Sequence, residues 1–215
     1  SYWSHLSQGC AAHGYAVAMP GYTLCPDVHI GDIVLEIGQA ITSIASRFEG
    51  PVHLAGHSAG GHLVSRMVSS TSPLAPDVRA RIGTTVSISG VHDLRPLMHT
   101  NLNACLRITS QEAQHESPAL LEPGPDTRLF CWVGSNERGE FLRQNALLAN
   151  IWAGLGAQTM YSGPAAPCLR ARSIGLGIDP RQGDPCWCHA LDGGNTCVIL
   201  AAARMPASRV ASNRV

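Results

Sequence analysis

Hydrophobic and polar positions follow two patterns along the chain as far as Tyr161. Short apolar runs bounded by glycine, proline or polar residues predict buried strands at 14–19, 52–56, 84–89 and 128–134, and a further strand begins at 157–161. Between these runs, apolar residues recur at the spacing of one helical face in 30–48, 59–70 and 140–155. The sequence therefore predicts strands that alternate with helices.

Several of the predicted strands are apolar throughout, which is typical of strands covered on both sides. Their alternation with helices predicts a mostly parallel sheet with helices on both faces, the α/β class. No internal repeat and no low-complexity linker precedes residue 161. We therefore expect one α/β domain over residues 1–161.

The pattern breaks down after Tyr161. Residues 162–215 contain no Glu and no Phe, but they hold half of the cysteines and six of the arginines. Apolar periodicity disappears, and Pro, Gly and Ser interrupt every potential element. We expect 162–215 to be an irregular, disordered tail, because such a segment is difficult to bury in a core.

Charge and composition exclude several function classes. Fifteen acidic and 15 basic residues give no net charge, so no concentrated basic patch points to nucleic acid or an anionic membrane surface. No apolar run approaches the roughly 20 residues of a membrane span, and CVILAAA near the end is far shorter. Eight cysteines without framework spacing indicate reduced thiols in a cytoplasmic protein.

Candidate chemistry centres on Ser58, within the run VHLAGHSAGGHLV (52–64). Gly56 to Gly60 fit the pattern G-x-S-x-G, with an apolar strand before it and an amphipathic helix after it. A serine on such a tight, strained turn is exposed as a nucleophile, and small neighbours let strand and helix pass closely. The amide of Ala59, at the helix N-terminus, would stabilise a developing oxyanion. The alternative is a structural turn.

The chain contains ten histidines, and most of them have a structural explanation. His57 and His62 flank Ser58, and neither can reach back as its base, because the base normally arrives from a separate loop. His53 alternates within a predicted strand. His92 and His99 have two open placements, at the mouth of a cavity or on the surface.

Four stretches together carry a family resemblance: GHSAGGHL, then SISGVHDLRPL (87–97), SPALL (117–121) and VGSNERGEFLRQ (133–144). They resemble the kynurenine formamidase (arylformamidase) branch of the α/β-hydrolases, over about residues 1–161. The resemblance implies the α/β-hydrolase fold and hydrolysis of N-formylkynurenine to kynurenine and formate in tryptophan catabolism. It implies a Ser-acid-His triad, a small-molecule substrate, no cofactor and no metal, and it is compatible with a homodimer.

Two alternatives to the formamidase function stay open. Related members of the family act as carboxylesterases on small esters, so a general carboxylesterase is the first. The second is an inactive hydrolase remnant or binding protein, which a missing catalytic base would favour.

The resemblance also implies the acid of the triad. In the family motif the acid stands three residues before a Glu-Phe pair, which places it at Glu137, with Glu140, Phe141 and Gln144 following. A glutamate can orient a histidine and stabilise its imidazolium as an aspartate does. The alternatives are a solvated loop glutamate at this position, and Asp93 as the acid. Asp93 follows the preceding strand, where capping a helix is the simpler role.

Two pieces of the family pattern are absent from the sequence. A His-Gly-Gly-Tyr-Trp motif, whose amides supply the rest of the oxyanion hole, precedes the segment that this chain begins with. The base histidine of the family follows the strand that AQTMY begins, often as His-His, whereas this chain reads SGPAAPCLRARSIGLG. Only His189 comes later, without a strand or helix pattern to hold it. We therefore expect an α/β-hydrolase that is incomplete at both ends.

A frameshift after about residue 161 would explain the second gap. Residues 166–169 are encoded GCN-CCN-TGY-CTN, which read from the second base permits His-His-Val-Phe. Extending the shift on both sides permits RRHHVFVLDR, which resembles the missing histidine segment of the family. The abrupt change in composition supports this hypothesis independently.

A metal site in the tail is a further alternative. Its candidate ligands would be Cys186, Cys188, His189 and Cys197. Zinc sites favour C-x2-C spacings within a supporting fold, and this glycine-rich stretch offers neither. We therefore expect no metal.

Overall fold

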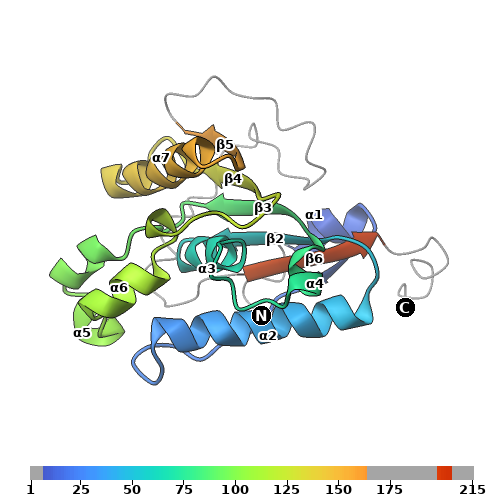
Figure 1. Ribbon diagram of the computed structural model, residues 1–215, viewed down its shortest axis with the longest axis horizontal. Helices are drawn as coiled ribbons and strands as arrows, with labels where there is room; N and C mark the ends of the chain where they lie inside the picture. Colours follow the sequence, from blue (N-terminus) through green and yellow to red (C-terminus); the bar gives the residue numbers. More distant parts are fainter. Residues whose placement is uncertain (1–6, 164–197, 205–215) are drawn as a thin grey trace.

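The computed structural model describes residues 7–163 and 198–204, the latter through their backbone (Figure 1). Six strands form one sheet in the order β1-β6-β2-β3-β4-β5. Their bounds are β1 (Tyr15–Ala18), β2 (Val52–His57), β3 (Ile82–Ile88), β4 (Arg128–Trp132), β5 (Gln158–Ser162) and β6 (Val198–Arg204).

The sheet is mostly parallel. Strands β2, β3, β4 and β5 run parallel to one another. Strand β6 is antiparallel to both β1 and β2, so β1 points in the same direction as β2. The carboxyl ends of β1 to β5 therefore share one edge of the sheet, where ligands of open α/β sheets bind. The predicted α/β class is confirmed.

Helices connect the strands, and each long helix lies where the sequence predicts one. The α-helices are α1 (Ser7–Ala12), α2 (Ile30–Arg47), α3 (Ala59–Met67), α4 (Pro76–Arg79), α5 (Asn103–Leu106), α6 (Ser110–Glu116) and α7 (Gly139–Gly154). Two 3-10 helices, η2 (Arg95–His99) and η3 (Pro118–Leu120), lie in the long excursion between β3 and β4. None of the described helices is long and apolar enough to cross a membrane.

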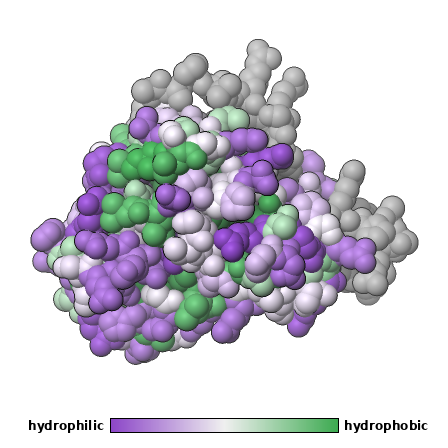
Figure 2. All heavy atoms as spheres, viewed as in Figure 1, coloured by the Kyte–Doolittle hydropathy of each residue, from purple (hydrophilic) through white to green (hydrophobic). Residues whose placement is uncertain are grey.

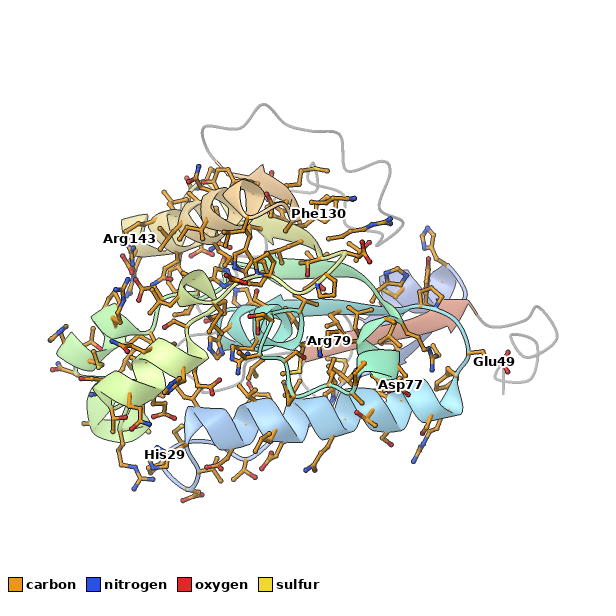
Figure 3. All side chains as sticks on the ribbon, viewed as in Figure 1. His29, Glu49, Asp77, Arg79, Phe130 and Arg143 are labelled. Carbon is orange, nitrogen blue, oxygen red and sulfur yellow. The ribbon has the colours of Figure 1, made fainter. Side chains whose placement is uncertain are left out.

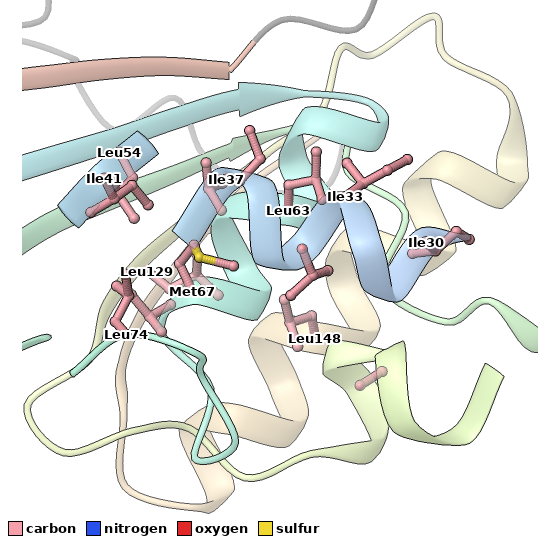
Figure 4. Packing of buried hydrophobic residues seen from close by; sticks show 14 of the residues in the cluster. Ile30, Ile33, Ile37, Ile41, Leu54, Leu63, Met67, Leu74, Leu129 and Leu148 are labelled. Carbon is pink, nitrogen blue, oxygen red and sulfur yellow. The ribbon is translucent and has the colours of Figure 1, made fainter. Parts of the chain in front are cut away.

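The core lies between the sheet and the three longest helices. Burial alternates along β2, where Val52 and Leu54 are almost fully buried, whereas His53, Ala55 and His57 are half-buried. These side chains join one cluster with Ile37 of α2, Leu63 of α3 and Leu148 of α7 (Figure 4). The outer surface of this face is largely hydrophilic, with a hydrophobic area over α7 (Figure 2).

The three longest helices pack together against the sheet. Within the described ranges, α2, α3 and α7 all contribute side chains to this single cluster. The alternation along β2 is hidden in the sequence, because its half-buried positions hold Ala55 and two histidines, which fit a buried or an exposed face.

The tail contains one regular element that the sequence did not predict. We expected 162–215 to be irregular, yet Ser162 ends β5 and Val198–Arg204 forms β6, a strand inside the sheet. Strand β6 pairs with both β1 and β2, so their backbone N–H and C=O groups find hydrogen-bonding partners. Residues 164–197 and 205–215 lie outside the described part of the chain.

Candidate active site

Ser58 occupies the turn between β2, which ends at His57, and α3, which begins at Ala59. Its backbone has φ 56° and ψ −116°, a left-handed conformation that costs a non-glycine residue about 1–3 kcal/mol. The Ser58 amide donates to the carbonyl of Ile88 at 2.9 Å, which holds the turn against β3. The predicted strained turn between a parallel strand and a helix is confirmed, with the strand running slightly beyond Ala55.

Small residues around Ser58 let the strand and the helix approach each other. A Cβ atom on Gly56 would lie 2.1 Å from the backbone oxygen of Gly60. A Cβ atom on Gly61 would lie 2.6 Å from Oγ of Ser87 on β3. These contacts are far closer than atoms tolerate, so both glycines are required by the packing of α3 against β2 and β3.

Ala59 is the first residue of α3, in the turn whose N–H groups have no acceptor within the helix. The helix dipole adds partial positive charge at this end. The geometry is therefore suited to stabilise an oxyanion beside Ser58. The predicted exposure of Ser58 is wrong, because packing of α3 against the sheet leaves the residue only 6% exposed.

Glu137 follows β4, at the same edge of the sheet as Ser58. It is half-buried, and its Oε1 accepts a hydrogen bond from Oγ of Ser89 at 2.7 Å. Ser89 follows β3, is 2% exposed and also has a positive φ, of 47°. Sequence reasoning missed Ser89, although it lies within the motif SISGVHDLRPL. The structure thus holds Glu137 at a fixed place beside the end of β3.

His57 immediately precedes Ser58 and interacts electrostatically with Glu137. Burial lowers the pKa of His57, and the negative charge of Glu137 partly opposes this shift. The carboxylate therefore acts on the residue adjacent to Ser58.

Asp93 is engaged elsewhere. Its carboxylate binds the guanidinium of Arg95 through two contacts of 2.9 and 3.0 Å, and Oδ1 accepts from the Arg95 amide at 3.1 Å. The hydrogen bonds from Arg95 hold the pKa of Asp93 below its usual range, against the opposing effect of burial. These bonds lie at the start of η2, where Leu94 rather than Asp93 occupies the N-cap position.

Two histidines near Ser58 are buried. Nε2 of His62 lies 2.6 Å from the carbonyl of Glu116, and burial lowers the pKa of His62 to about 4. Nε2 of His92 lies 3.1 Å from Oγ of Ser87, and burial lowers its pKa to about 3. Both expected placements of His92 are wrong because its side chain is fully buried, whereas His99 is exposed.

Two amide side chains of α7 clamp the loop after β3. Oε1 of Gln144 accepts from the backbone amides of His92 and Asp93 at 2.8 and 2.7 Å. Asn145 bonds both the N–H and the C=O of Gly90, at 3.3 and 3.2 Å. Both amides are almost fully buried. The family-like stretches 87–97 and 133–144 therefore meet in space as one hydrogen-bonded unit.

The described residues provide no candidate metal centre at this site. Among the described residues, no group of three His, Cys, Asp or Glu side chains could hold a metal ion. The tail residues Cys186, Cys188, His189 and Cys197 lie outside the described ranges. A surface pocket of about 670 Å³ lies between α7 and β5, lined by Leu147 and Tyr161 among others. It does not include Ser58 or Glu137.

Several known proteins are similar to this chain. No family model matches the chain. The chain is 28% identical over 159 residues to kynurenine formamidases of Danio rerio and Salmo salar, covering 67% of this chain and 54% of each relative. It is 22% identical over 181 residues to the kynurenine formamidase of Drosophila melanogaster. The chain thus spans about half the length of the curated vertebrate relatives it matches.

Solved structures give the fold. A protein from Silicibacter sp. TM1040, assigned as a thioesterase, has 43% identity and a TM-score of 0.69, covering 75% of this chain and 60% of that one. An esterase of the bacterial hormone-sensitive lipase family has a TM-score of 0.55 at 18% identity, covering 76% and 61%. The chain is therefore a distant homologue of the kynurenine formamidases with the α/β-hydrolase fold.

Proposed function

We propose that the chain carries the nucleophile, the acid and one oxyanion donor of a serine hydrolase of the kynurenine formamidase type. Ser58 is the nucleophile, Glu137 the acid that orients the base, and the Ala59 N–H an oxyanion donor. The observation that carries the proposal is the strained backbone of Ser58 at the junction of β2 and α3. Distant homology to kynurenine formamidases supports the substrate class.

The reaction follows from the positions of these groups. The Ser58 oxygen attacks the formyl carbonyl of N-formylkynurenine, and the Ala59 amide stabilises the resulting oxyanion. Collapse of this intermediate breaks the C–N bond, releases kynurenine once its amine takes a proton, and leaves a formyl-serine. Water then attacks the formyl-serine, which yields formate and regenerates Ser58.

The sequence does not supply the catalytic base, a histidine expected after the strand that AQTMY begins. A serine hydroxyl keeps an alcohol's poor nucleophilicity until a histidine accepts its proton. We therefore expect the unaided chain to hydrolyse N-formylkynurenine only slightly above background, and added imidazole to raise the rate. Ser58→Ala should abolish both the residual and the imidazole-stimulated rate. Glu140→Gln, in the same region as Glu137, is a control for general effects of substitution.

Each outcome of this assay bears on the proposal. Absence of a Ser58-dependent rate, with or without imidazole, together with no labelling of Ser58 by a fluorophosphonate, would overturn it. Robust turnover without imidazole that Ser58→Ala removes would support the nucleophile and show that another residue is the base. His189 would be the first residue to substitute in that case.

A general carboxylesterase is the second candidate. Likeness to an esterase and to a protein assigned as a thioesterase favours it. Parallel assays with N-formylkynurenine and p-nitrophenyl acetate separate the two. A Ser58-dependent rate on the ester alone would favour the carboxylesterase.

A further inference from the structure

Two cysteines that lie far apart in the sequence meet in the structure. Cys25 belongs to the loop between β1 and α2, and Cys105 belongs to α5. The Cys105 thiol donates to the backbone carbonyl of Cys25, with 3.4 Å between sulfur and oxygen. One sulfur is therefore in direct contact with the backbone of the other cysteine.

The contact between the cysteines is part of a larger junction between the two segments. The guanidinium of Arg107 donates to the carbonyl of Pro26, next to Cys25. Further along, Nδ1 of His29 lies 3.5 Å from the carboxylate of Glu112, and the Gly31 amide donates to Glu112 at 3.4 Å. His29 is labelled where α2 begins in Figure 3. These bonds hold the backbones of Cys25 and Cys105 side by side.

The two thiols differ in their access to a small disulfide and in their acidity. Cys105 is exposed and Cys25 is half-buried, whereas Cys10 and Cys131 are buried. Burial raises the pKa of Cys25, and the negative charges of a Cys105 thiolate and of Glu112 raise it further, while Arg107 opposes them. Burial raises the pKa of Cys131 to about 12, so this core thiol is a poor nucleophile.

We propose that Cys25 and Cys105 are a redox-active pair that forms a reversible intramolecular disulfide, with a low-molecular-weight disulfide as the oxidant. The exposed Cys105 sulfur loses its proton and attacks the small disulfide, which forms a mixed disulfide and releases one small thiol. The Cys25 thiolate then attacks the Cys105 sulfur and releases the second small thiol. The two cysteines are oxidised, and the small disulfide is reduced to two thiols, each of which carries one proton.

The bond would join two segments that leave the same edge of the sheet. The Cys25 loop follows β1, and the Cys105 segment belongs to the excursion that follows β3. Both begin at the carboxyl edge, where β2 delivers Ser58. Transient, regulatory disulfides of this kind occur in reducing compartments. Any effect of the disulfide on hydrolysis rests on the proposed function, whereas formation of the disulfide does not.

The test uses the full chain, reduced, freed of reductant and then incubated with glutathione disulfide. Chymotryptic digestion without reduction, followed by mass spectrometry, should identify a disulfide-linked peptide pair that contains Cys25 and Cys105. Cleavage after Tyr15 and Tyr22 separates Cys25 from Cys10. Dithiothreitol should remove the link. Cys25→Ser should leave Cys105 as a glutathione mixed disulfide, and Cys105→Ser should leave Cys25 largely unmodified.

Other results would overturn the inference. Separate glutathione adducts on Cys25 and Cys105, two free thiols, or a pairing of either with another cysteine would each show that the contact does not lead to a bond. The readout requires no enzymatic activity. A failed hydrolase assay with an intact link would therefore count against the proposed function alone.

Discussion

At the scale of single residues, two strained serines mark the ends of neighbouring strands. Ser58 follows β2 with φ 56°, and Ser89 follows β3 with φ 47°. The Ser58 amide donates to Ile88 at the end of β3, and the Ser89 amide donates to Trp132 at the end of β4. Sheet hydrogen bonding thus continues into the first residue of each loop and stabilises conformations that are otherwise unfavourable. Both side chains are thereby fixed at the edge of the sheet.

The first prediction concerns the charge of Glu137. In the unmodified chain, the Glu137 carboxylate favours the protonated His57 ring and so opposes the effect of burial. Glu137→Gln removes this charge and should therefore lower the pKa of His57 further. An NMR titration of the His57 ring protons measures this shift. Glu140→Gln is the control, because the interactions of Glu140 are with Arg143 and Gln144. An unchanged His57 titration in Glu137→Gln would show that the two side chains do not interact.

At the scale of elements, the approach of α3 to the sheet decides the geometry of the turn. Gly56 and Gly61 lie where the backbone of α3 passes β2 and β3, and the side chain of Arg66 anchors the far end of the same helix. Its Nε donates to Glu116 of α6 at 2.7 Å, and both groups are largely buried. A buried ion pair of this kind is costly to break, because it leaves one charge without its partner.

The second prediction tests this close approach. Gly56→Ala should lower the free energy of unfolding by about 3 kcal/mol or more, because its Cβ would overlap the backbone oxygen of Gly60. Gly139→Ala is the matched control, since a Cβ there meets no atom within 4 Å. Urea denaturation of the two variants measures the difference. Equal stabilities would mean that α3 can move away from β2 without cost.

At the scale of the whole molecule, two neutral histidines are buried, His62 on α3 and His92 in the loop after β3. Below its usual pKa of 6.5, each ring is protonated in the unfolded chain, while the folded chain resists protonation down to about pH 4 for His62 and about pH 3 for His92. The unfolded state therefore binds more protons in that window, so stability falls as the pH falls.

The third prediction follows from this loss of stability at low pH. The free energy of unfolding should decrease between pH 7 and pH 4, with His62 contributing on the order of 3 kcal/mol. His62→Gln should flatten this dependence, because glutamine does not titrate and can still donate toward the Glu116 carbonyl. Urea denaturation at several pH values measures both curves. The same slope in the variant and the unmodified chain would contradict the role of His62.

Strands β1 to β5, the long helices and the turn at Ser58 could be predicted because local patterns encode them. Apolar runs, helical periodicity and G-x-S-x-G each depend on residues close in sequence. The resemblance to a family located Glu137, whereas its partner Ser89 was missed, because their contact joins residues 48 positions apart. The burial of His92 and the clamp by Gln144 and Asn145 were missed for the same reason, since polar side chains give no signal of long-range partners.

The sequence by itself determined the order of strands β1 to β5 and of the long helices, and the turn that carries Ser58, the proposed nucleophile. Hydrophobic periodicity and turn-forming residues encode these features within a few residues. The tertiary structure alone decided the rest. It packed α2, α3 and α7 into one cluster, inserted β6 between β1 and β2, and brought Cys105 against Cys25. Each of these outcomes depends on backbone hydrogen bonds and apolar contacts between segments that are distant in sequence. The local pattern of hydrophobic and polar residues does not encode which distant segments pair.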